Sequence, residues 1–146
     1  MFITLNRKKY IKKINKDTNF RDQLIQIYGD IVMDKYFFSK GGLFVFYQKD
    51  NNIIASLKIN KKEDEENNKY YQIRSVFVNH EYRGQGYCKK IISHVIGILV
   101  KFNLPILLDV EPNNLPAINC YKANNFVEIG NKMIKDIEHI TMMYKK

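Results

Sequence analysis

The stretch "VNHEYRGQGYCKKIISHVIGIL", residues 78–99, holds the feature from which the fold is predicted. An apolar run ends at Val78, polar residues follow, and the chain then reads Arg83-Gly84-Gln85-Gly86. Directly afterwards, apolar residues recur at helical spacing, which predicts a helix over about residues 86–102. Two of the seven glycines of the chain thus stand at the N-terminus of the predicted helix.

This glycine turn, residues 83–88, has the properties of an anion-binding site. The first N–H groups of a helix lack intrahelical partners and carry partial positive charge. Glycines let successive N–H groups converge and let a ligand approach the backbone, so the turn predicts a phosphate site. The two common nucleotide patterns do not fit, because GxxxxGK[ST] is absent and Lys89 stands where GxGxxG requires a third glycine.

The flanking segments predict a βαβ unit. Residues 70–78 and 105–112 read as strands on either side of the helix, so they should be parallel neighbours in one sheet. The fold class is therefore α/β (α+β): a mixed, mostly antiparallel sheet with a central parallel pair, flanked by helices, in a single domain of residues 1–146. The other expected elements are a helix at 19–36 capped by Thr18 and broken by Gly41-Gly42, strands at 43–48 and 53–59, a charged loop at 60–69, a helix at 113–125 ended by Asn125, and strands at 126–130 and 139–145.

Composition is that of an ordinary globular protein. The chain has 146 residues, of which 45% are hydrophobic and 27% charged. No apolar run reaches the roughly 20 residues that span a bilayer, and the N-terminus lacks the pattern of a secretory signal, so a cytoplasmic protein without membrane contact is expected. Cys88 and Cys120 have neither metal-ligand spacing nor a disulfide framework around them, so two reduced thiols are expected. His80, His94 and His139 each stand alone, and no metal site is predicted.

A net charge of +9 raises the alternative of a nucleic-acid-binding module. Lysine supplies most of that charge, and the abundance of lysine, isoleucine and asparagine is what AT-rich coding sequence produces. The aromatic residues, 13% of the chain, fall mostly in predicted strands and helix faces, and no RNP-like motif is present. The sequence therefore disfavours nucleic acid as a partner, although its charge still favours an anionic ligand.

Two motifs resemble those of the GNAT superfamily of N-acetyltransferases. The glycine turn is similar to motif A, R/Q-x-x-G-x-G/A, with Cys88 in the last place. The resemblance covers residues 70–130 well and the N-terminal half only in outline. The segment "NNLPAINCYKANNF" is similar to motif B, N-x-x-A-x-x-x-Y-x-x-x-G-F, at Asn114, Ala117, Tyr121 and Phe126, with Asn125 in the glycine place.

The resemblance implies an enzyme that transfers an acetyl group from acetyl-CoA to an amine, which attacks the thioester directly. The glycine turn would bind the pyrophosphate of coenzyme A, and Tyr121 matches the general acid near the leaving sulfur. The acceptor could be a peptide N-terminus, a lysine or a small-molecule amine, and the protein a monomer or a homodimer. The residues expected to bind the co-substrate are Val76, Phe77, Val78, Arg83, Gly84, Gln85, Gly86, Tyr87, Cys88, Lys89, Asn114, Ala117 and Tyr121.

The proton of the attacking amine needs a second group. The segment "LLDVEPNN" resembles the "LEV…N" stretch of the subfamily that acetylates protein N-termini, which puts Asp109 in the place of that subfamily's glutamate base. Glu111 shares the strand face with Asp109 by the period of two. The alternative for Asp109 is a structural carboxylate bonded to backbone N–H groups. The motif A strand offers Gln72 and Arg74, neither of which is a useful base.

Amine basicity favours an α-amine as the acceptor. At pH 7, neutralising a lysine amine with a pKa of about 10.4 costs roughly 4–5 kcal/mol, whereas an α-amine with a pKa of about 7.7–8.0 costs about 1 kcal/mol. An α-amine is therefore easier to deprotonate in a site whose proposed base is an aspartate, with a shorter side chain than glutamate. Two other function classes stay open: a GNAT-fold protein that binds acyl-CoA without catalysis, against which Tyr121 argues, and the basic nucleic-acid module.

Overall fold

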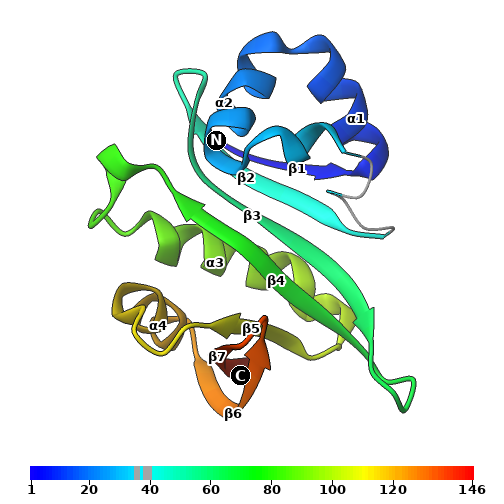
Figure 1. The fold of residues 1–146 in the computed structure, drawn as a ribbon, viewed down its shortest axis with the longest axis vertical. Helices are drawn as coiled ribbons and strands as arrows, with labels where there is room; N and C mark the ends of the chain where they lie inside the picture. The colour runs from blue at the N-terminus through cyan, green and yellow to red at the C-terminus, as the bar shows by residue number, and fades with distance from the viewer. Residues whose placement is uncertain (35–36, 38–40) are drawn as a thin grey trace.

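The computed structural model describes the chain except for residues 35–36 and 38–40. The described strands form one seven-stranded sheet in the order β1-β2-β3-β4-β5-β7-β6 (Figure 1). The strands are β1 (Phe2–Asn6), β2 (Leu43–Lys49), β3 (Asn52–Glu63), β4 (Lys69–Val78), β5 (Ile106–Val110), β6 (Phe126–Ile134) and β7 (Ile137–Tyr144). The described α-helices are α1 (Arg7–Lys16), α2 (Thr18–Tyr28), α3 (Tyr87–Leu99) and α4 (Leu115–Ala123), with 3-10 helices η1 (Asp30–Met33), η3 (His80–Tyr82) and η4 (Val100–Phe102).

The predicted βαβ unit is confirmed. β4 and β5 pair in parallel, from Tyr71 opposite Ile106 to Ile73 opposite Leu108, and α3 lies in the connection between them. The other neighbouring strands of the sheet pair antiparallel. The sheet is therefore mixed and mostly antiparallel, with one parallel pair inside it, as the sequence predicts.

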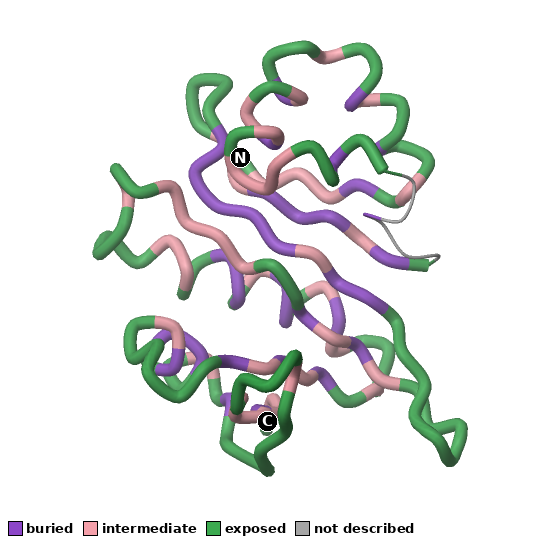
Figure 2. Tube along the Cα trace, viewed as in Figure 1, coloured by how far each residue is buried: buried purple, intermediate pink, exposed green. Residues whose placement is uncertain are grey.

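Helices cover both faces of the sheet, and alternation along β2 shows why. Phe44 and Phe46 are buried against α1 and α2, whereas Val45 between them is buried in the core that α3 and α4 share. Buried residues consequently run along β2 and β3, between the two cores (Figure 2). The layer of α1 and α2 packs over β1, β2 and β3. These two helices do not extend over β5, β6 and β7 on the same face of the sheet (Figure 1).

The N-terminal segment contains two elements that the sequence pattern did not predict. β1 pairs with β2, and α1 follows it directly, with the Asn6 side chain accepting a hydrogen bond from Lys9 N–H. Of the residues of α1, only Tyr10 and Ile14 are buried. One apolar pair four residues apart, in a segment rich in lysine, is too weak a pattern for a helix prediction.

The second helix is shorter than predicted. Its N-cap is Asp17, whose side chain bonds the first turn, and not Thr18, which is already helical. α2 ends before Gly29, whose φ is 83°, so this glycine and not Gly41-Gly42 ends the helix. The expected helix extended to residue 36, and residues 35–36 lie outside the described part of the chain.

The remaining elements agree with the prediction except at their ends. The charged loop expected at 60–69 is shorter, because β3 extends to Glu63 and β4 begins at Lys69. α4 begins after Asn114, and Asn125 has the left-handed conformation expected past the helix end, with a φ of 67°. The last two strands form a hairpin. None of the helices in the described ranges is long and apolar enough to cross a membrane.

Candidate active site

β4 and β5 stop pairing part-way along β4. The last paired residues are Ile73 and Leu108, yet β4 continues to Val78 with β3 as its neighbour. The β5-facing backbone edge of this part of β4 is therefore open to a ligand. A cleft of about 240 Å³ lies where the strands part. Its lining residues are Ile73, Arg74, Ser75, Val76, Leu108, Asp109, Val110, Glu111, Asn114, Tyr121 and His139.

A β-bulge shapes the β4 wall of the cleft. The register between β3 and β4 shifts at Ser75, whose φ of 56° is left-handed. The Tyr28 hydroxyl of α2 donates to the Ser75 carbonyl oxygen at 2.9 Å and accepts from Ser56 Oγ at 2.6 Å. Burial raises the pKa of Tyr28 to about 12, so this hydroxyl keeps its proton at neutral pH. Strained non-glycine backbone clusters at functional sites, and Tyr28 is a supporting residue that the sequence did not reveal.

The glycine turn lies at the N-terminus of α3. Gly84 and Gly86 have φ values of 75° and 84°, and Gly86 is the N-cap without a side-chain bond to the first turn. A Cβ at either position would meet no atom within 4 Å. Arg83 Nε donates to the Val78 carbonyl oxygen at 3.1 Å, which holds the turn at the end of β4. The first N–H groups of α3 are thus available to an anion at the positive end of the helix.

α4 places Tyr121 in the cleft. Asn114 caps this helix, with its Oδ1 accepting from Ala117 N–H at 3.3 Å. Tyr121 is 5% exposed, and its hydroxyl bonds to no other residue of the described chain. Burial raises the pKa of Tyr121 to about 12. The hydroxyl is therefore neutral at pH 7 and has a hydrogen to donate to a ligand in the cleft.

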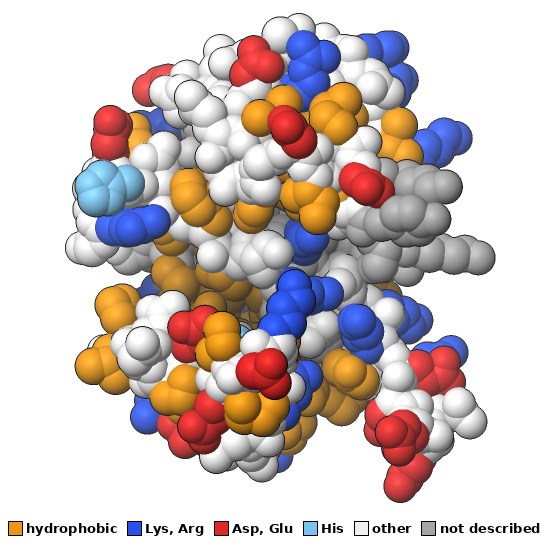
Figure 3. Space-filling model, in the orientation of Figure 1, with side chains coloured by type: hydrophobic (Ala, Val, Ile, Leu, Met, Phe, Trp, Pro, Cys, Tyr) orange, Lys and Arg blue, Asp and Glu red, His pale blue; other side chains and the backbone are white. Residues whose placement is uncertain are grey.

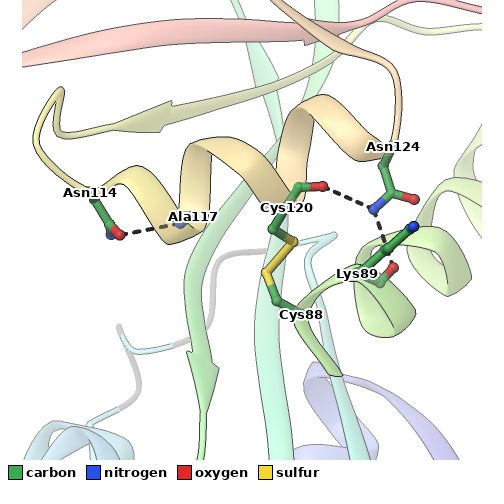
Figure 4. The surroundings of a disulfide bond; sticks show 6 residues. All are labelled: Cys88, Lys89, Asn114, Ala117, Cys120 and Asn124. Atoms are coloured by element: carbon green, nitrogen blue, oxygen red, sulfur yellow. Dashed lines mark hydrogen bonds between the residues drawn. A yellow bond between two sulfur atoms is a disulfide. The ribbon is translucent and has the colours of Figure 1, made fainter. Parts of the chain in front are cut away.

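A disulfide connects the glycine turn to α4 (Figure 4). Cys88 is bonded to Cys120, the residue before Tyr121, and their Cα atoms are 6.2 Å apart. Asn124 Nδ2 donates to the carbonyl oxygens of Lys89 and Cys120, both at 3.2 Å. The prediction of two reduced thiols is wrong for this structure. The two cysteines are 32 residues apart, and they meet because α3 and α4 pack side by side, which their spacing in sequence does not show.

The other predicted co-substrate residues differ in where their side chains lie. Val76 lines the cleft, and Val78 packs against the core of α3 and α4. Phe77 points to the opposite face, where its ring centre is 6.2 Å from that of Tyr28. Gln85 Nε2 donates to the Glu81 carbonyl oxygen at 3.3 Å, inside the turn. Only the backbone of Phe77 can therefore face a ligand on the side of α3.

Comparison with known proteins agrees with this geometry. A sequence model described as the acetyltransferase (GNAT) family matches residues 10–126. The chain belongs to this family. None of the curated proteins gives a significant sequence match.

Solved structures share the fold of this GNAT chain at low identity. Escherichia coli ElaA is 17% identical with a TM-score of 0.69, over 99% of each chain. The NatC complex bound to Gag peptide and CoA is 17% identical with a TM-score of 0.64, over 100% of this chain and 98% of the other. AAC(6')-Ib in complex with ribostamycin and coenzyme A is 15% identical with a TM-score of 0.69, over 100% and 93%. The fold is thus the GNAT fold.

Asp109 of this GNAT chain, the predicted base, belongs to a network of side chains. Its carboxylate accepts hydrogen bonds from Thr141 Oγ1 at 2.7 Å and Gln72 Nε2 at 3.4 Å, and Lys132 Nζ lies 3.0 Å from Oδ2. The side chain is 10% exposed and lines the cleft with Tyr121. Its partners are side chains, whereas the structural alternative named backbone N–H groups. The role of Asp109 as a base stays a prediction.

Two further ionisable side chains of the GNAT chain line the cleft. Glu111 lines the cleft with Asp109, although β5 ends at Val110 and not at the predicted residue 112. His139 comes from β7, where its Nδ1 is 2.9 Å from the Ile137 carbonyl oxygen. The sequence treats His139 as isolated, because only the pairing of Thr141 with Asp109 brings β7 to this place. In the part of the chain described, no three His, Cys, Asp or Glu side chains gather as metal ligands.

Proposed function

We propose that this protein transfers an acetyl group from acetyl-CoA to a primary amine by direct attack of the amine on the thioester. One observation carries the proposal: the buried Tyr121 side chain presents a neutral hydroxyl to the cleft between β4 and β5, on the helix that is bonded to the glycine turn. A group with a hydrogen to donate is what the leaving sulfur needs. Membership of the acetyltransferase family supports the same reaction.

The glycine turn and the edge of β4 fit coenzyme A. The N–H groups at the start of α3, and the open space beside Gly84 and Gly86, suit a pyrophosphate. Arg83 and Lys89 add positive charge at the turn. Residues 76–78 offer backbone groups to an extended ligand, as a sheet edge does to a peptide. Two of the similar structures hold coenzyme A, which supports this assignment.

Two proton movements accompany the transfer. Bound acetyl-CoA supplies the carbonyl carbon that the amine attacks. Tyr121 gives its hydrogen to the sulfur as the carbon–sulfur bond breaks, so that coenzyme A leaves as a thiol. The amine nitrogen gives up one proton as the amide forms, and Asp109 is the proposed acceptor, either directly or through a water. The proton lost by the amine balances the one supplied by Tyr121.

We infer that the acceptor is an amine of low basicity, such as an α-amine, since it needs the least help to lose its proton. The likeness of "LLDVEPNN" to the subfamily that acetylates protein N-termini favours a peptide N-terminus. The fold alone does not choose the acceptor, because the NatC structure holds a peptide and the AAC(6')-Ib structure an aminoglycoside.

Thiol release from acetyl-CoA, measured with peptides, lysine derivatives, polyamines and small amines, tests the proposal. Acetyl-CoA should raise the melting temperature, and at least one amine should release the thiol. Tyr121→Phe keeps the ring and should lower kcat by about 10²-fold with little change in acetyl-CoA affinity. Tyr144→Phe, on the same core but outside the cleft, is the matched control. Wild-type turnover in Tyr121→Phe excludes that role. If acetyl-CoA does not raise the melting temperature and no amine releases the thiol, the proposed function is excluded.

A further inference from the structure

Lys58 and Arg74 bring two positive charges together on one face of the sheet, beside the cleft. Lys58 of β3 and Arg74 of β4 are direct partners in the antiparallel ladder, next to the bulge. Direct partners lie on the same face of a sheet with Cβ atoms about 4.5–5.5 Å apart, and like charges in this arrangement are destabilising. Arg74 itself lines the cleft that contains Tyr121.

No acidic side chain of the described chain offsets these two charges. None of its ion pairs includes Lys58 or Arg74. Lys58 Nζ instead donates to the Phe37 carbonyl oxygen at 3.0 Å and lies 4.0 Å from the centre of the Phe37 ring. The sequence of residues 35–36 and 38–40 includes no aspartate or glutamate. Arg74 is exposed and Lys58 half-buried, so the pair is accessible to an anion from outside the chain.

The surroundings of Lys58 disfavour its own charge. Burial first, and the charge of Arg74 second, lower the pKa of Lys58 from 10.5 to about 8. An anion placed between the two side chains would oppose both effects, because a nearby opposite charge favours the charged form of an amine. The fold thus keeps a cation pair that the protein itself does not complete.

The pair lies on the face of the sheet opposite to α3 and α4. Ile73 packs into the core of α3 and α4, so Arg74 faces the other side, where Lys58 meets Phe37 of the α1–α2 core. In Figure 3 the surface is hollowed between the layer of α1 and α2 and the β6–β7 hairpin, with Lys and Arg side chains bordering the hollow. The pair is therefore separate from the glycine turn at the start of α3.

We propose that Lys58 and Arg74 bind an anionic group, a carboxylate or a phosphate, that the amine acceptor carries. This inference rests on the proposed acetyl transfer. The β5 wall of the cleft ends in Glu111, which forms no ion pair with another described residue and offers a negative charge to an ammonium group. The cleft thus has a negative side at β5 and a positive side at β4, which fits an amine and an anion on one molecule.

This assignment is tested with pairs of acceptors whose two members differ only in whether they carry the anionic group. Suitable pairs are 4-aminobutanoate with 4-aminobutanamide, phosphoethanolamine with ethanolamine, and the amidated dipeptides Ser-Asp and Ser-Asn, each compared at equal concentration of free amine. The anionic member of at least one pair should have a kcat/KM higher by about tenfold or more, as expected for one charge-assisted contact. The preferred pair shows whether a carboxylate or a phosphate is bound.

Variants then locate the anion. Arg74→Gln and Lys58→Met should each bring the ratio of anionic to neutral acceptor toward one. Lys62→Met is the matched control, since Lys62 is an exposed lysine of the same strand, opposite Tyr70, and it should keep the ratio. Equal use of both members of every pair by the wild type, or an unchanged ratio in Arg74→Gln, overturns the anion site while acetyl transfer stands.

Two further measurements distinguish an acceptor site from an anion site for coenzyme A, and the failure of this inference from the failure of the proposed function. If Arg74→Gln loses the rise in melting temperature with acetyl-CoA, the anion belongs to coenzyme A and the acceptor site is rejected. If no acceptor releases the thiol, the proposed function fails. The anion site can then still be tested by itself, through the binding of inorganic phosphate. Phosphate should raise the melting temperature of the wild type more than that of Arg74→Gln, and equal rises reject the site.

Discussion

Cys88 and Cys120 share a disulfide that joins the first turn of α3 to α4, one residue before Tyr121. The helix end with free N–H groups and the helix with the proposed acid are therefore held together by a covalent bond, which Asn124 supports from the next turn of α4. The chain has two cysteines in all, so a reductant acts on this bond alone. Chemical and thermal unfolding can thus be measured with and without it.

Reduction of the Cys88–Cys120 bond should destabilise the protein. For cysteines 32 residues apart, the chain-entropy model gives a loss of about 3–4 kcal/mol in the free energy of unfolding. Denaturant titration with and without reductant measures this loss, and the double variant Cys88→Ala/Cys120→Ala should unfold alike under both conditions. Alkylation of both thiols without prior reduction, or unfolding that reductant does not change, would contradict the bond.

Gly86→Asp should abolish the thermal response to acetyl-CoA and still fold. The aspartate would put a negative charge beside the N–H groups proposed to bind pyrophosphate. At a φ of 84° the new side chain costs about 1–2 kcal/mol of stability. Gly41→Asp is the matched control, since Gly41 has a φ of 78°, equally open surroundings and a place outside the turn. If both variants respond to acetyl-CoA alike, the co-substrate binds elsewhere.

Tyr28→Phe should impair both stability and catalysis. It keeps the ring but removes the hydroxyl that bonds the Ser75 carbonyl oxygen and Ser56 Oγ, which should cost about 1–3 kcal/mol because the buried Ser56 loses its partner. Tyr10→Phe removes another buried bond of the same core, to the Val32 carbonyl oxygen at 2.8 Å, which involves no residue of the bulge. Unfolding curves should move in both variants, whereas kcat/KM should fall only in Tyr28→Phe. An equal fall in both would mean that the bulge needs no support from Tyr28.

The centre of the fold could be predicted because its signals are local. Gly84 and Gly86 stand directly before a helix whose buried face repeats at helical spacing, and a strand rich in β-branched and aromatic residues lies on either side of it in the sequence. α1 has no such signal, since only Tyr10 and Ile14 of its residues are buried. Its helical structure depends on packing against β2, which no local pattern contains.

A site residue could be predicted where a sequence motif contains it. It could not be predicted where the pairing of distant strands brings it to the site. Tyr121 follows from a spaced motif within α4. Tyr28 reaches Ser75 across 47 residues, and His139 comes to the cleft only through the pairing of β7 with β5. The partnership of Lys58 with Arg74 follows from the register of β3 with β4, which runs unbroken from the turn between them to this pair, and the sequence pattern does not give that register.

Asp109→Asn tests the proposed base. The variant is isosteric and can still accept a hydrogen bond from Thr141, but it loses the charge that Lys132 neutralises. We expect a folded enzyme with slower acetylation at neutral pH. The defect should shrink as pH rises, because more of the acceptor amine is then already neutral. An α-amine should recover at lower pH than a lysine, following their difference of about 2.5 pKa units.

Lys132→Met separates this role from a structural one. It removes the ion pair with Asp109 but leaves the carboxylate, and because Lys132 is 48% exposed the pair itself should add about 1 kcal/mol or less to stability. If Asp109 is the base, Lys132→Met should keep most of the activity at neutral pH because the carboxylate remains, and only Asp109→Asn should show the large loss that high pH repairs. If Asp109 only holds β5 against β7 through Thr141, Asp109→Asn should unfold earlier and be equally slow at every pH. That outcome would direct the search for the proton acceptor to Glu111 and His139, the other ionisable side chains that face the cleft from β5 and β7.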